Sequence, residues 1–196
     1  MTVVIVDAGG ANIGSLRGAL GRLGVNAALT ADPEEIRAAD KLILPGVGAA
    51  GAAMARLRTL DLVQVLRAAT QPLLGICLGM HLLCAHSEED DSECLGLIPT
   101  NVRRLARRPG LRVPHMGWNR LKAIAPHPLT ADLGDDAHVY FVHSYAVPVN
   151  GCTLVSTEHG EPFSSVMAEG NRFGMQFHPE RSGAVGAKLL ERFLAL

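Results

Sequence analysis

Residues 72–81, which read Pro-Leu-Leu-Gly-Ile-Cys-Leu-Gly-Met-His, constrain the fold more than any other stretch of the chain. An apolar run leads into Gly-Ile-Cys-Leu-Gly and then into a leucine-rich segment, which predicts a strand, a sharp turn and a helix with Cys77 at the apex. Side chains two positions to either side of such an apex would collide, and glycine at 75 and 79 removes them. Free N–H groups at the start of the helix favour the thiolate. The stretch predicts a nucleophile elbow with sulfur in place of oxygen.

A candidate base for this nucleophile lies about a hundred residues later, in residues 172–181 (Arg-Phe-Gly-Met-Gln-Phe-His-Pro-Glu-Arg). An alternating apolar strand ends at His178, and Pro179 stops its hydrogen bonding. In extended backbone, residues two apart point to the same side, so Glu180 is positioned to orient the His178 imidazole and stabilise its charged form. A buried cysteine beside glycines, or a His-Pro-Glu turn, is more often structural when it occurs alone. Together they predict a nucleophile, a base and an orienting carboxylate.

These two motifs resemble those of the class I, or triad, glutamine amidotransferases. Three further stretches narrow the resemblance: residues 42–49 (Leu-Ile-Leu-Pro-Gly-Val-Gly-Ala), 113–119 (Val-Pro-His-Met-Gly-Trp-Asn) and 140–145 (Tyr-Phe-Val-His-Ser-Tyr). With them the chain resembles, over essentially its whole length, the glutaminase subunits of imidazole glycerol phosphate synthase. The cysteine and histidine motifs are class-wide, whereas Pro-Gly-Val-Gly and Pro-His-Met-Gly-Trp-Asn are much more specific.

The resemblance implies a role for each of several residues. The catalytic triad would be Cys77, His178 and Glu180. The oxyanion hole would involve Val47, Gly48 and the Leu78 N–H. The glutamine site would involve His81, Glu89, His143, Ser144 and Tyr145. The partner-facing residues would be Asn12, Trp118, Asn119 and Arg181.

Three positions depart from the usual family pattern. His81 stands where the family mostly has Gln, and we expect its imidazole to donate the hydrogen bond that the amide would. Ala8 stands where an aromatic residue usually follows the first strand, so the local contact with the partner is changed. Arg181 stands where Lys is usual, which keeps the charge but alters the hydrogen-bond geometry.

The implied reaction begins when the Cys77 thiolate attacks the side-chain amide of L-glutamine. His178 protonates the leaving ammonia and then activates the water that hydrolyses the thioester to glutamate. No metal or cofactor is required. The resemblance implies a heterodimer with a cyclase subunit, a (β/α)₈ barrel that uses the ammonia to form imidazole glycerol phosphate and an aminoimidazole carboxamide ribonucleotide. A chain of 196 residues is too short to contain such a barrel as well, since one needs ~250 residues.

Two other functions remain open on the sequence. The chain could be the amidotransferase subunit for another acceptor, of the anthranilate or carbamoyl phosphate type, although Pro-Gly-Val-Gly and Gly-Trp-Asn count against it. It could also be a non-catalytic regulatory subunit of the same fold. The intact Cys77, His178 and Glu180 count against that alternative.

Composition excludes several other classes. The formal charge of −1 gives no electrostatic case for nucleic acid or an anionic membrane as the main partner, and 48% hydrophobic residues argue against disorder. No apolar stretch approaches the ~20 residues needed to cross a bilayer. The four cysteines, at positions 77, 84, 94 and 152, lack metal-ligand spacing and are expected to be reduced thiols in the cytoplasm.

The expected fold is a single α/β domain over residues 1–196, with a mostly parallel central sheet flanked by helices and a small antiparallel extension. The pattern predicts parallel strands at 2–7, 26–29, 41–44 and 72–77, a strand at 137–145, and antiparallel strands at 153–158, 164–169 and 172–177. It predicts a helix capped by Asn12 that runs to about Leu23, a helix that opens at Asp32 or Pro33, and helices at 51–69, 80–86 and 183–196. Residues 87–93 are expected to form a solvated acidic loop in which only Glu89 has a functional role.

Overall fold

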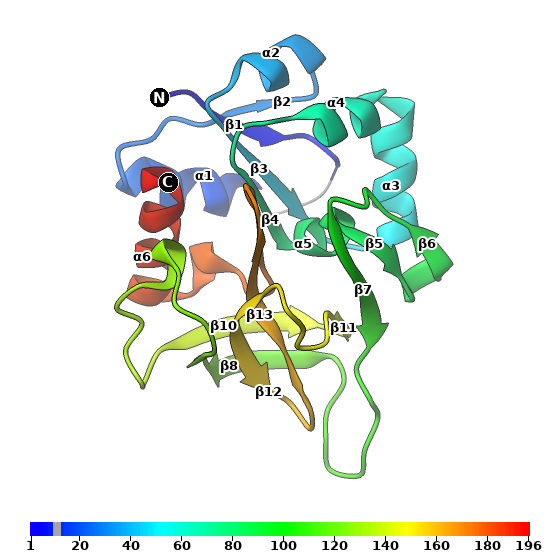
Figure 1. Ribbon diagram of the computed structural model, residues 1–196, viewed down its shortest axis with the longest axis vertical. Coiled ribbons are helices and arrows are strands. Elements are labelled where there is room, and N and C mark those ends of the chain that lie inside the picture. Colours follow the sequence, from blue (N-terminus) through cyan, green and yellow to red (C-terminus); the bar gives the residue numbers. More distant parts are fainter. Residues whose placement is uncertain (10–12) are drawn as a thin grey trace.

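In the computed structural model, which describes residues 1–9 and 13–196, an eight-stranded sheet runs through the centre of the molecule (Figure 1). Its strand order is β2-β1-β3-β4-β14-β13-β12-β9. The strands are β1 (Val3–Val6), β2 (Ala28–Thr30), β3 (Lys41–Gly46), β4 (Leu73–Cys77), β9 (Lys122–Ala123), β12 (Thr153–Glu158), β13 (Pro162–Glu169) and β14 (Arg172–Met175). Neighbours from β2 to β14 pair in parallel and those from β14 to β9 antiparallel, which confirms the predicted α/β fold with an antiparallel extension.

Helices cover both faces of the parallel part of the sheet. Helices α1 (Ile13–Arg22) and α6 (Gly183–Ala195) lie on one face, and α2 (Pro33–Ala38), α3 (Ala50–Thr59), α4 (Leu62–Ala68) and α5 (Leu78–Leu83) lie on the other (Figure 1). Since both faces are covered, every residue of β1 and β4 is buried, as the continuous apolar runs of these strands require. No helix in the described part of the chain combines the length and apolarity of a membrane span.

Two smaller sheets adjoin the main one. Strands β8 (His115–Arg120) and β10 (His138–His143) form an antiparallel ribbon, in which Trp118 pairs with Tyr140 and His115 with His143. The other sheet has the order β11-β7-β5-β6. Its strands are β5 (Cys84–Ser87), β6 (Ser92–Glu93), β7 (Ile98–Arg104) and β11 (Tyr145–Ala146). Together these sheets build the walls around the carboxyl end of β4.

The helix predicted over residues 80–86 is wrong in its second half. Helix α5 ends at Leu83, and β5 begins at the next residue. The reason is tertiary: the carbonyls of residues 82–84 accept hydrogen bonds from the N–H groups of residues 95–97, so they cannot accept the next helical bonds. The region 51–69 is helical, but Asp61, with φ of 55°, divides it into α3 and α4.

Candidate active site

The elbow at Cys77 has the strained backbone that the sequence predicts. Cys77 has φ 53° and ψ −111°, and it is the last residue of β4, directly before α5. A Cβ at position 79 would lie 1.7 Å from the Leu44 carbonyl oxygen, and one at position 75 would lie 2.5 Å from the Gly79 carbonyl oxygen. Both contacts are with backbone, which cannot move aside as a side chain can. The two glycines therefore allow α5 to start against β3 and β4.

His178 and Glu180 form a buried pair beside this elbow. His178 Nδ1 and Glu180 Oε1 are 3.0 Å apart, and the two side chains are 7% and 3% exposed. Burial alone would lower the pKa of His178, but its hydrogen bonds with Cys77 and Glu180 outweigh that effect and raise the pKa from 6.5 to about 10. The imidazole is therefore held as an imidazolium next to the thiol.

The backbone that joins this pair differs from the expectation. Strand β14 ends at Met175, and residues 179–181 form a 3-10 turn (Pro179–Arg181) instead of continuing extended. Ser182 closes the turn, because its hydroxyl donates to the His178 carbonyl oxygen at 2.7 Å. The predicted contact between histidine and carboxylate is present, but the reason given for it from extended backbone is wrong.

A cavity of about 320 Å³ opens over the thiol. That volume is in the range of small-molecule sites. Its lining consists of Val47, Gly48, Cys77, Leu78, His81, Glu89, Val142, His143, Ser144, Tyr145 and His178. The structure thus brings together all the predicted oxyanion and substrate residues, and Glu180 is the one predicted catalytic residue behind the wall. Val142 was not predicted, and its carbonyl oxygen lies 3.9 Å from Cys77 Sγ.

Gln176 is a second residue that the sequence reasoning missed. Its side-chain Nε2 faces Cys77 Sγ at 4.0 Å, and its Oε1 lies 2.8 Å from His81 Nε2. The parallel pairing of β14 with β4 brings it there. A polar residue within the buried apolar run 172–177 was the available signal.

His81 presents an acceptor to its surroundings, not the donor that was expected. Burial lowers the pKa of His81 to about 4, so the ring is neutral. Because Gln176 Oε1 accepts, His81 Nε2 carries the proton and Nδ1 is left with a lone pair. Nδ1 is buried and has no hydrogen-bond partner within the described residues.

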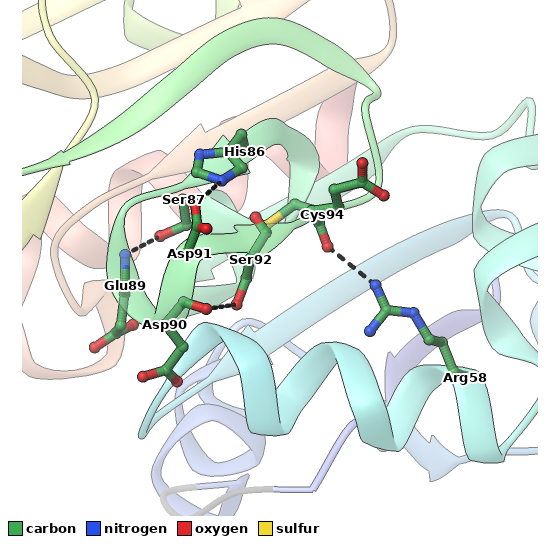
Figure 2. A network of polar contacts seen from close by, with 9 residues as sticks. Arg58, His86, Ser87, Glu89, Asp90, Asp91, Ser92 and Cys94 are labelled. Atoms are coloured by element: carbon green, nitrogen blue, oxygen red, sulfur yellow. Dashed lines mark hydrogen bonds and ion pairs between the residues drawn. The ribbon is translucent and has the colours of Figure 1, made fainter.

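Glu89 reaches the cavity from a kinked turn between β5 and β6 (Figure 2). Asp90 and Asp91 have φ of 58° and 46°, so two consecutive left-handed residues reverse the chain directly after Glu89. The Ser87 hydroxyl accepts from the Glu89 N–H at 3.2 Å, and Glu89 Oε2 accepts from the Ala50 N–H at 3.1 Å. Burial raises the pKa of Glu89, and the Ala50 N–H opposes this. The carboxylate is thereby fixed as an acceptor at the cavity wall.

The predicted oxyanion loop follows β3. Gly46 is required by packing, because a Cβ there would lie 2.9 Å from the Leu78 Cβ. Gly48 has φ of 92° and open space around it, so it supplies the conformational freedom of the loop. Val47 between them is 37% exposed.

The residues predicted to face a partner fall into three groups. Trp118 is 57% exposed and packs edge-on against Tyr140, whose ring also carries the Arg181 guanidinium 4.5 Å from its centroid. With Met116, 63% exposed, these residues form a surface that we call the ribbon patch. Asn119 lies on the opposite face of β8, and its amide is hydrogen-bonded internally. Asn12 lies outside the described residues.

Comparison with known proteins gives a consistent result. The profile of the family described as Glutamine amidotransferase class-I matches residues 4–196. The chain is 55% identical over 196 residues to the imidazole glycerol phosphate synthase subunit HisH of Idiomarina loihiensis, covering 100% of this chain and 98% of that protein. It is 53% identical over 194 residues to the protein of the same name from Xanthomonas euvesicatoria, covering 99% and 97%.

Solved structures share the fold at low sequence identity. A structure described as a glutamine amidotransferase has a TM-score of 0.78 and 20% identity, covering 100% of this chain and 98% of that one. A structure of PurLQS from Thermotoga maritima has a TM-score of 0.73 and 18% identity, covering 99% and 97%. At these identities the likeness shows the fold alone.

Proposed function

The chain belongs to the class-I glutamine amidotransferase family, and from that premise we propose that it is the glutaminase subunit of an imidazole glycerol phosphate synthase in histidine biosynthesis. The observation that carries the glutaminase activity is the Cys77 thiol at a strained elbow beside the His178–Glu180 pair, in the lining of a cavity of about 320 Å³. The full-length identity to two HisH proteins supports the choice of synthase over the other acceptors.

The proposed reaction follows from the charges in the site. A thiolate at Cys77 attacks the carboxamide carbon of glutamine, and the oxygen of the tetrahedral intermediate is bound by backbone N–H groups of Leu78 and the Val47–Gly48 loop. The imidazolium of His178 donates a proton to the departing ammonia, leaving a thioester. His178 then accepts a proton from water, which attacks the thioester and releases glutamate. Glu180 stabilises the imidazolium before His178 donates its proton and again after His178 accepts one from water.

Binding of the amino-acid end of glutamine is assigned to Glu89, with His81 beside it in the cavity lining. The Glu89 carboxylate is an acceptor, and the α-ammonium group of glutamine carries three donors. The backbone of residues 143–145 borders the same end of the cavity. This arrangement would favour a free amino acid over a neutral amide that lacks the ammonium group.

The acceptor of the ammonia is proposed to be a cyclase subunit that docks on the ribbon patch. An exposed Trp beside an Arg stacked on Tyr is the composition of an interface hot spot. Arg181 follows the catalytic Glu180 directly, so a contact at the patch would act close to the triad. We propose that Asn119, on the opposite face of β8, supports this interface from within the protein. We also propose that the complex is cytoplasmic.

Steady-state release of glutamate from glutamine tests the proposal. We expect the isolated chain to be at least about 10²-fold slower than its complex with the cyclase subunit and cyclase substrate, because the open space around Gly48 would let the Val47–Gly48 peptide rotate and leave the oxyanion hole unformed at rest. A chain that releases no glutamate under any of these conditions would exclude the glutaminase. Equal rates for the lone chain and the liganded complex would exclude only the proposed rotation of the Val47–Gly48 peptide.

A further inference from the structure

A chain of side-chain hydrogen bonds crosses the inner face of the β8–β10 ribbon. Asn119 Nδ2 lies 3.1 Å from His115 Nε2, and His115 Nδ1 lies 2.9 Å from His143 Nε2. His143 Nδ1 lies 2.8 Å from the Tyr145 carbonyl oxygen. The chain therefore runs from the strand that carries Trp118 to the backbone that borders the candidate glutamine cavity.

Backbone groups fix the direction of this chain at both ends. The Tyr145 carbonyl oxygen can only accept, so His143 Nδ1 must carry a proton. At the other end, Asn119 Oδ1 accepts from the Arg120 N–H at 2.8 Å and Asn119 Nδ2 donates to the Glu158 carbonyl oxygen at 3.0 Å. The amide orientation is thus determined, and the second hydrogen of Nδ2 points to His115.

The two rings between these ends then have one allowed tautomer each. Burial lowers the pKa of His115 to about 4 and that of His143 well below its usual value, so both rings are neutral. A neutral His143 with a proton on Nδ1 has a bare Nε2, which must accept from His115 Nδ1–H. His115 Nε2 is then bare and accepts from Asn119. In this series of hydrogen bonds from Asn119 to Tyr145, every donor therefore meets one acceptor.

Packing holds the central ring in this orientation. His115 is stacked between His159, at 4.1 Å between centroids, and Phe141, at 4.8 Å. His159 is itself held by a 2.7 Å hydrogen bond to the Arg112 carbonyl oxygen. Strand register adds to this, because His115 and His143 are directly paired across the ribbon. A shift of β8 therefore moves His115 and, through it, His143.

We propose that Asn119 and His115 are positioning residues: through His143 they set the position of the residue 143–145 backbone and so the affinity of the cavity for glutamine. The proposal rests on the glutaminase function given above. It also gives the ribbon patch a route to the cavity, since Trp118 and Asn119 are neighbours on opposite faces of one strand. Binding of a partner to the outer face of β8 would act on the glutamine site through these hydrogen bonds.

The direct test is the tautomeric state of the two rings, measured by ¹⁵N NMR on the histidine-labelled full chain. We expect both His115 and His143 to carry their proton on Nδ1 at neutral pH. A proton on Nε2 of either ring in the wild type would overturn the proposal. This measurement requires no catalytic activity, so it stands even if the glutaminase function fails.

Two variants test the link to glutamine. Asn119→Asp removes the hydrogen-bond donor to His115, so the proton of His115 should move to Nε2. His115 Nδ1 can then no longer donate to His143. The KM for glutamine in the cyclase complex should rise about 5–10-fold with less change in kcat. His115→Phe keeps the stacked ring and should raise KM similarly. Asn101→Asp, an exposed change on β7 of the same charge, is the matched control.

The outcomes separate the two claims. A raised KM in both variants, with the control unchanged, supports positioning by the chain. An unchanged KM in His115→Phe overturns it, even if Asn119→Asp fails to fold. Absence of glutamate release by the wild-type complex would instead count against the proposed function.

Discussion

Replacing Glu180 by Gln removes one charge from the His178 pair while keeping the size of the side chain. The two groups are 3.0 Å apart and nearly inaccessible to water, so water cannot replace the lost carboxylate. A buried hydrogen bond with a charged partner contributes about 1.5–3 kcal/mol, and most of that is lost with the charge. The imidazolium of His178 should be destabilised by that amount relative to the neutral ring.

The result should be visible as a lower pKa for His178. At 1.36 kcal/mol for each pH unit, Glu180→Gln should lower the pKa of His178 by about 1–2 pH units from the wild-type value of about 10. An NMR titration of the His178 ring measures this directly, with Glu191→Gln on the exposed side of α6 as the control. The kcat/KM for glutamine should fall about 10–100-fold. An unchanged or higher pKa for His178 would refute the assignment of Glu180 as the stabilising charge.

The same pair predicts a pH dependence of stability. Because the pKa of His178 is raised in the folded state, its contribution is fully present below pH 6.5, the ordinary value, and is lost as the pH rises toward about 10. Urea unfolding of the wild type should show stability declining across that window. The decline should be smaller in Glu180→Gln, and an equal decline in both proteins would contradict the linkage.

Substitutions at three other positions, Cys77, His81 and Gly79, have definite expected outcomes. Cys77→Ser should abolish glutamine hydrolysis, because a hydroxyl is a much weaker acid and nucleophile than a thiol, while the cyclase complex should still use supplied ammonium. Retained glutaminase activity would remove Cys77 from the mechanism. His81→Gln should keep or improve glutamine affinity, whereas His81→Ala should raise KM with less effect on kcat; equal kinetics for all three proteins would show that His81 does not contact substrate. Gly79→Ala places a Cβ 1.7 Å from the Leu44 carbonyl oxygen and should lower the free energy of unfolding by about 3 kcal/mol. The control Gly134→Ala, whose Cβ would meet no atom within 4 Å, should lower it by about 0.5 kcal/mol or less. Urea denaturation measures both values, and similar losses would contradict the steric argument.

Local features of the site could be predicted from the sequence. The elbow depends on glycines two positions from Cys77, and that spacing is visible in five residues. The closeness of His178 and Glu180 in the sequence also indicates their contact, although the 3-10 turn over Pro179–Arg181, and not extended backbone, brings the two side chains together. The fold class follows from apolar runs that alternate with helical segments, because strands covered on both faces must be continuously apolar.

Features set by distant contacts could not be predicted in this way. Helix α5 ends early because residues 95–97 take its last carbonyls, and no pattern within residues 80–86 signals that competition. Gln176 reaches Cys77 only through the pairing of β14 with β4. The inward position of Asn119 and the outward position of Trp118 depend on which face of β8 meets Phe141. Sequence spacing gives the alternation along a strand but not which face is covered.

The central claim is that Cys77 is an activated thiol in a glutamine site. Treatment of the full chain with a chloroketone analogue of glutamine, followed by peptide mass spectrometry, tests it most directly. We predict that Cys77 alone is alkylated and that excess glutamine protects it. Burial raises the pKa of the Cys84 thiol well above its usual value and raises the pKa values of Cys94 and Cys152 to about 11, so those three thiols stay protonated. Modification of any of these three cysteines at a similar rate, or labelling of Cys77 that glutamine does not reduce, would contradict the account.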